Sequence, residues 1–188
     1  MILNSTIPQN RGGVDEVIAE GIVASGDSFP TLLTLESLPT EGIDHYKIII
    51  NAPKADNGSS STEIRRLKAR NLTSTDYQNC TYIDINSSSY TRAQSSTFSR
   101  EYNLDIACMT AVDRMNLFDA DIYIMPDGKG VCFFKSAAIG SSYNTTEGHD
   151  SFVGSGVVLY LQVGSYFDFD YRTCYSGDGY YKVVKCAN

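Results

Sequence analysis

Apolar and polar residues alternate with a period of two in several runs of this chain, and this alternation constrains the fold more than any other feature. Four runs show it: HYKIIINA (residues 45–52), LFDADIYIM (117–125), GVVLYLQV (156–163) and YFDFDYRT (166–173). Successive side chains of a β-strand point to opposite faces, so a strand with one buried face has this pattern. The runs therefore predict half-buried antiparallel strands.

The alternation also predicts which side chains of each strand are buried. The expected inward residues are Tyr46, Ile48 and Ile50; Phe118, Ala120, Ile122 and Ile124; Val157, Leu159, Leu161 and Val163; and Phe167, Phe169 and Tyr171. The opposite faces then carry the carboxylate pairs Asp119–Asp121 and Asp168–Asp170. Because residues two apart share a strand face, each acidic pair is expected on a solvated face of a sheet.

Turn signals separate roughly ten such runs, and no segment has the pattern of a long helix. The clearest turns are ADNGSSS (55–61), PDGKG (126–130) and SGDGYY (176–181). We therefore predict an all-β fold, an antiparallel β-sandwich with a jelly roll as the leading topology. The run TEIRRLKA (62–69) indicates a bulge or a short helix, and DEVIAEGIVAS (15–25) indicates a strand or a brief helix.

The start of the chain differs in composition from the rest. Its first 14 residues, MILNSTIPQNRGGV, are polar and contain one proline and a Gly-Gly pair. We predict an extended N-terminal arm over residues 1–14 and a single β-sandwich domain over residues 15–188. The arm is a natural attachment strap, and four of its residues are candidates for contact with a partner: Ile2, Leu3, Ile7 and Arg11.

The net charge limits the classes of partner. The chain of 188 residues has a formal net charge of −7. This argues against nucleic acid, because phosphate binding needs an excess of Lys and Arg, and it disfavours anionic membrane surfaces. No apolar run approaches the roughly 20 residues of a membrane span, and MILNSTIPQN lacks the features of a signal peptide. We expect a protein of the cytosol, or of an assembly built there.

Five cysteines, an odd number, occur without any CxxC pair. This spacing argues against a zinc site. The expected state is reduced and mostly buried thiols. Cys174 and Cys186 flank a turn-rich segment, and a disulfide between them across a hairpin is the alternative, which requires an oxidising environment.

Catalytic and metal-binding patterns are weak in this chain. His45 is expected to be a half-exposed strand residue and His149 a solvated loop residue, since neither has a partner evident in the sequence. The paired carboxylates could in principle bind calcium or hydrolyse glycosides, but a solvated sheet face explains them. Ser155 lies in a GSG that lacks the surroundings of a nucleophile elbow. We predict no enzyme, no catalytic residue, no metal and no cofactor.

Tyrosines gather in segments that are expected to be long loops, over residues 86–103 and 140–155 and near the C-terminus. Three of them are candidates for partner binding: Tyr90, Tyr143 and Tyr175. Exposed aromatic rings stack on sugars and also make protein contacts. Packing of these rings at the ends of the sheets is the plainer interpretation, and both remain open.

The order of several segments resembles small virion structural domains of tailed bacteriophages. The segments are TLLTLESLPTEGIDHYKIII (31–50), EIRRLKARNLTSTDY (63–77), ADIYIMPDGKGVCFFKSAA (120–138) and GVVLYLQVGSYFDFDYRTCYSGDGYYKVV (156–184). The match is one of order and pattern, and it extends over residues 28–185.

The resemblance implies a jelly-roll or related sandwich without catalytic residues, used in capsid decoration, head fibres or tail appendages. It favours a decoration or cement protein that binds and stabilises an assembled shell, with the major capsid protein or other virion proteins as partners. The alternative is a head-fibre or tail-appendage module that recognises a host surface glycan or protein. We further expect a homo-oligomer, with a trimer favoured, located in virions that assemble in the bacterial cytoplasm.

Overall fold

A computed structural model gives the fold of the chain. It describes residues 13–53, 64–73, 80–86, 89–95, 103–111, 115–139, 151–170 and 177–187. The described part contains no helix, and its strands form two antiparallel sheets. The all-β prediction is therefore confirmed. The arm residues 1–12 lie outside the described residues.

The described residues form twelve strands. Their bounds are β1 (Glu16–Val23), β2 (Leu33–Thr34), β3 (Asp44–Ala52), β4 (Ile64–Arg70), β5 (Cys80–Asn86), β6 (Ser89–Ser95), β7 (Asn103–Ala111), β8 (Met115–Ile124), β9 (Lys129–Ile139), β10 (Ser151–Tyr160), β11 (Tyr166–Asp170) and β12 (Gly179–Cys186). The segment DEVIAEGIVAS thus contains a strand, β1. The run TEIRRLKA contains β4, whose pairing with β7 shifts register twice, so the bulge is the correct alternative.

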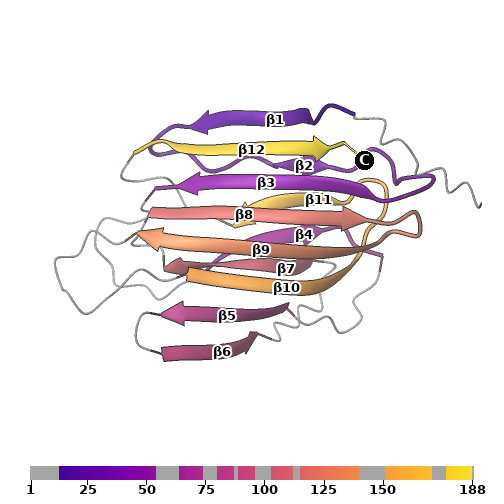
Figure 1. The fold of residues 1–188 in the computed structure, drawn as a ribbon. Coiled ribbons are helices and arrows are strands. Elements are labelled where there is room, and N and C mark those ends of the chain that lie inside the picture. Colours follow the sequence, from indigo (N-terminus) through magenta and orange to yellow (C-terminus); the bar gives the residue numbers. More distant parts are fainter. Residues whose placement is uncertain are drawn as a thin grey trace, which may run out of the picture.

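The strand order is that of a jelly roll. One sheet has the order β1-β12-β3-β8-β9-β10-β5-β6 and the other β2-β11-β4-β7. Figure 1 shows the eight-stranded sheet in front and the four-stranded sheet behind it. The chain passes from one sheet to the other at each step from β1 to β5, and again between β6 and β7, β7 and β8, β10 and β11, and β11 and β12. Two four-stranded groups, β1-β12-β3-β8 and β2-β11-β4-β7, are thereby interleaved, as the two Greek keys of a jelly roll require.

Two hairpins widen the larger sheet. Strands β5 and β6 follow β4, and strands β9 and β10 follow β8; all four join the eight-stranded sheet beyond β8. The outer surface of this sheet is therefore wider than that of the four-stranded sheet behind it (Figure 1).

The core lies between the two sheets and contains the predicted inward residues. Ile48, Ile50 and Ile122 are fully buried in the larger sheet, and Phe167 is fully buried in the smaller one. Burial of one such side chain stabilises the fold by about 1.5–3 kcal/mol. The alternation therefore assigned the buried faces correctly in β3, β8 and β11.

One residue of the predicted inward set is exposed. Val163 is 61% exposed, whereas Leu161 is buried. The reason is that β10 ends at Tyr160 and a turn follows, in which the Ser165 N–H donates to the Gln162 carbonyl at 2.9 Å. The side chains of Val157 and Leu159 and all of Tyr171 lie outside the described part.

The PDGKG turn connects β8 to β9 and packs against the end of β10. Gly128 has a φ of +78°. Its carbonyl accepts a hydrogen bond from the Leu161 N–H at 2.8 Å. A Cβ atom on Gly128 would lie 2.2 Å from the Leu161 carbonyl oxygen. The position therefore requires glycine for its backbone conformation and for the close approach.

We expect Ile122→Asp to lower the free energy of unfolding by several kcal/mol, because it places an unpaired charge between the sheets. The matched control is Phe133→Asp on the opposite face of the same sheet, where the native side chain is 45% exposed. Urea denaturation of both variants measures the difference. Equal midpoints would show that the facing of β8 is assigned incorrectly.

Gly128→Ala should lower the free energy of unfolding by more than about 2 kcal/mol, since strain at positive φ is added to a backbone clash. Gly26→Ala is the control, because Gly26 has a φ of +98° but no atom lies within 4 Å of the position that an added methyl group would occupy. Gly26→Ala should lower the free energy of unfolding by only about 1 kcal/mol. Thermal denaturation of the two variants separates the clash from the backbone strain, and equal losses would contradict the close approach to Leu161.

Candidate functional site

The residues predicted to bind a partner fall mostly outside the described part of the chain. This applies to Ile2, Leu3, Ile7 and Arg11 in the arm, and to Tyr143 and Tyr175. Tyr90 was expected in a loop but lies in β6, where it pairs with Ile85 of β5. Residues 89–95 form a strand, in which Tyr90 and Thr91 favour extended structure. Similarly, β10 begins at Ser151, inside the second predicted loop.

The most distinctive described surface is the outer face of the eight-stranded sheet, the side turned away from the smaller sheet. We use "outer face" for its part on β1, β12, β3, β8 and β9. The strand registers arrange its side chains in four rows: Cys186–His45–Tyr123–Val131; Val17–Val184–Lys47–Asp121–Phe133; Glu20–Lys182–Ile49–Asp119–Lys135; and Ile22–Tyr180–Asn51–Leu117–Ala137.

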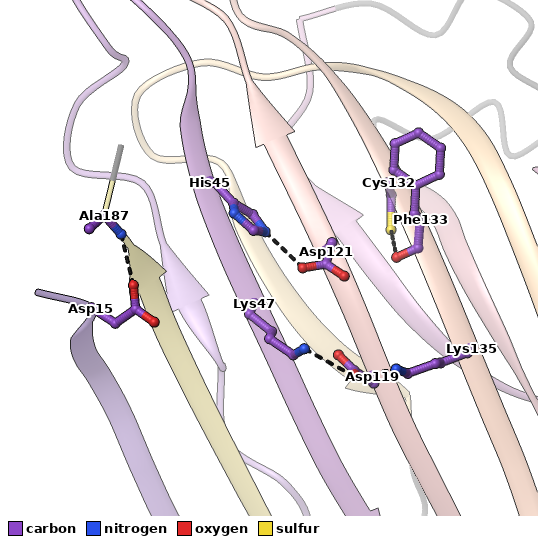
Figure 2. Close-up of polar contacts among 9 residues, drawn as sticks. All are labelled: Asp15, His45, Lys47, Asp119, Asp121, Cys132, Phe133, Lys135 and Ala187. Atoms are coloured by element: carbon purple, nitrogen blue, oxygen red, sulfur yellow. Dashed lines mark hydrogen bonds and ion pairs between the residues drawn. The ribbon is translucent and has the colours of Figure 1, made fainter. Parts of the chain in front are cut away.

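The charged residues of the outer face are paired with one another (Figure 2). A single carboxylate oxygen of Asp119, Oδ2, lies 3.2 Å from Lys47 Nζ and 3.1 Å from Lys135 Nζ. Asp121 Oδ1 lies 2.7 Å from His45 Nε2. Such partly exposed pairs add little to stability, typically about 0–1 kcal/mol each. Their main effect is to hold the charges in a defined pattern on the sheet.

Another pair extends this pattern to the edge of the sheet. Lys182 Nζ on β12 lies 3.4 Å from Glu20 Oε2 on β1. The six charged residues of the four rows therefore divide equally between three cations, Lys47, Lys135 and Lys182, and three anions, Glu20, Asp119 and Asp121. The outer face has no formal net charge when His45 is neutral.

Aromatic and aliphatic side chains lie between the ion pairs. The His45 ring stacks on Tyr123 with centroids 4.3 Å apart, and Tyr123 meets Phe133 edge to face at 6.0 Å. Phe133 is 45% exposed, as is Leu117, and Ile22 is 74% exposed. Exposed apolar groups among neutralised charges are a composition that suits contact with another protein.

The ion pairs also influence protonation. Desolvation disfavours the charged form of Lys47, but its hydrogen bond with Asp119 and the nearby negative charges outweigh this, so the pKa of Lys47 is raised. Desolvation, together with the charge of Asp121, raises the pKa of Tyr123. Lys47 is therefore held as a cation, and Tyr123 is held as a neutral phenol.

Cys186, His45 and Asp121 lie on the adjacent strands β12, β3 and β8. A catalytic triad contains a nucleophile, a base and an acid that orients the base in the same order. Cys186 is the register partner of His45. However, partial burial and the charges of Asp15 and Asp121 raise the pKa of Cys186, whereas a nucleophilic cysteine needs a lowered one. In the described ranges, no group of three or more His, Cys, Asp or Glu residues is placed to hold a metal ion.

Cys132 and Cys186, the cysteines whose side chains are described, carry free thiols. Cys132 is buried and Cys186 is half-buried. Cys174, the other half of the predicted alternative disulfide, lies outside the described residues. The described thiols thus agree with the reduced state expected from the sequence.

The prediction for the acidic pairs was incomplete. Asp119 and Asp121 do lie on an outward face, as expected, and Asp168 of the other pair lies 2.6 Å from Arg70 Nε. Their cationic partners were not foreseen. A signal was present, since two basic-type residues two apart, His45 and Lys47, match two aspartates two apart on another predicted strand.

Comparison of the chain with protein-family models, curated protein sequences and solved structures gives no match. Within the described residues, no helix is long and apolar enough to cross a membrane. What the chain does is therefore inferred from its fold, from the outer face and from the order of segments in its sequence.

The buried thiol of Cys132 should make stability depend on alkaline pH. Burial raises the pKa of Cys132 well above its usual range. The unfolded chain loses this proton above about pH 8.5 while the folded chain keeps it, so the free energy of unfolding falls as the pH rises. The fall approaches about 1.4 kcal/mol per pH unit. Cys132→Ala should remove this component between about pH 9 and pH 11, as measured by urea denaturation.

Cys186→Ala is the control for this measurement, because the Cys186 thiol is only half-buried. Its pH profile should stay closer to that of the parent. If Cys132→Ala keeps the full parental slope, thiol burial is not its cause.

Proposed function

We propose that the chain is a non-enzymatic structural protein of a tailed-bacteriophage virion, most consistent with a capsid decoration protein that binds the assembled shell. The order of segments over residues 28–185 supports the class of protein. The jelly-roll topology is compatible with it, since capsid proteins are among the proteins that use this fold. Fold alone does not determine function, so the proposal needs a surface that suits docking.

The outer face is the observation that carries the proposal. The chain has a net charge of −7, whereas the charged residues of the four rows, three cations and three anions, sum to zero. The excess of seven negative charges therefore lies elsewhere on the molecule. The outer face is broad, has no net charge and carries exposed apolar side chains, so it can approach another protein with little repulsion.

In this role the protein acts by mass action. A protein that binds the assembled shell, and not its free subunits, stabilises the shell by the free energy of binding. The arm would supply a second attachment through Ile2, Leu3, Ile7 and Arg11 to the major capsid protein. The sandwich would be the rigid domain that carries both the arm and the outer face. The expected trimer remains a prediction from the sequence.

The chain should co-purify with virions in a copy number comparable with that of the capsid subunits, which quantitative mass spectrometry of purified particles measures. Deletion of residues 1–14 should abolish capture by shells that lack the protein, while the melting temperature of the sandwich stays close to that of the parent. A copy number of only a few per particle would instead support a fibre or tail appendage. Absence from virions would contradict the proposal, and shell capture without residues 1–14 would contradict the role of the arm.

A further inference from the structure

In one row of the outer face, residues at equal distances on either side of β3 carry opposite charges. The row consists of Glu20, Lys182, Ile49, Asp119 and Lys135, on β1, β12, β3, β8 and β9 in that order. In this order, the side chains are negative, positive, uncharged, negative and positive. A rotation of 180° about an axis along β3 exchanges β1 with β9 and β12 with β8. Two copies placed face to face by this rotation therefore have opposite charges opposite each other.

We propose that the outer face binds the outer face of a second copy of the chain, in a two-fold dimer whose axis runs along β3. In this dimer, Glu20 of each copy faces Lys135 of the other, Lys182 faces Asp119, and Ile49 faces itself. The contact is isologous, so each of these charge pairs forms twice. The inference goes beyond the proposed virion role and replaces the expected trimer with a dimer. A copy in this dimer cannot bind a shell through the same face, so the shell and the second copy would compete for it.

The other rows agree with this arrangement. The rotation places Val17 opposite Phe133, and Tyr180 opposite Leu117. Val17 is 46% exposed, and Phe133 and Leu117 are each 45% exposed, so these contacts bury apolar surface that faces water in the single chain. Ile22, which is 74% exposed, comes to lie opposite Ala137.

Residues on the axis face their own copies. Lys47 is the charged one, and its ammonium group is already matched by Asp119 of the same chain at 3.2 Å. Asp121 comes to face Val184 and keeps His45 as its partner at 2.7 Å. The internal ion pairs thus neutralise the charges that the dimer itself does not pair.

The size and charge of the face also suit a second copy. Five strands at about 4.8 Å and four rows at about 6.8 Å cover roughly 600 Å² per copy, or roughly 1,200 Å² in total, which is the lower limit of stable interfaces. Two sheets pack face to face with their strands within about 30° of parallel. Two copies of charge −7 repel each other, and the neutral outer face is where this repulsion is weakest.

Charge reversal at the outermost pair tests the dimer. Glu20 and Lys135 are suitable because both are solvent-exposed, at 54% and 70% of their side chains. Glu20→Lys places two cations at each contact, and Lys135→Glu places two anions there. Sedimentation velocity of the parent at increasing protein concentration and low salt should show a dimer. Each single variant should dimerise at least about tenfold more weakly, because like charges become juxtaposed.

Restoration of opposite charges distinguishes contact between copies from effects within one copy. The double variant Glu20→Lys/Lys135→Glu pairs opposite charges again across the dimer. Within each copy it places like charges at both native pairs, Glu20–Lys182 and Asp119–Lys135. An equimolar mixture of the two single variants should likewise form a heterodimer. We expect both samples to dimerise within about threefold of the parent, which an effect confined to one chain cannot produce.

Two further variants complete the experiment. Glu36→Lys changes the net charge as Glu20→Lys does, but it lies next to Leu35, whose N–H bonds to Ser165 beside the smaller sheet. It should leave the dimer intact. Phe133→Ser should weaken the dimer by removing apolar contact, and it tests the face if a charge variant fails to fold, as circular dichroism would show. A monomeric parent, a trimer, or a double variant no tighter than the single variants would each overturn the inference.

Discussion

Burial of apolar side chains between the two sheets is the interaction on which the rest of the structure depends. One continuous core includes Ile48 and Ile50 of β3, Phe118 of β8, and Phe167 and Phe169 of β11. These strands are far apart in the sequence, and they meet only because the chain passes repeatedly from one sheet to the other. Each crossing adds a strand whose inward residues complete the core, which makes the jelly roll a single cooperative unit.

The same alternation that fills the core also creates the outer face. When Ile48 and Ile50 point inward, Lys47 and Ile49 must point outward, and the same holds for Asp119 and Asp121 of β8. The antiparallel register then sets cations of β3 and β9 beside the anions of β8. Core packing therefore determines which charges meet on the surface, and a shift of one residue would bury them.

Much of the fold could be predicted, because period-two alternation and turn sequences are patterns of neighbouring residues. The inward residues of β3, β8 and β11 follow from period-two alternation, and the turn at Gly128 follows from its PDGKG sequence. The errors occurred where alternation alone could not mark the end of a strand. Val163 continues the pattern of β10 but lies in the turn after it, and Tyr90 stands in a Ser-rich segment that forms β6. The partners of the aspartates were missed because they come from other strands.

By itself, the sequence determined the fold class, the buried face of the main strands and the acidity of the molecule, since these depend on composition and on the spacing of neighbouring residues. Only the tertiary structure decided which strands pair and in which register. His45 and Asp121 are 76 residues apart, and no local pattern brings them together. The charge order of the outer face arises from four such pairings, so the surface proposed to bind a second copy is a property of the assembled sheet.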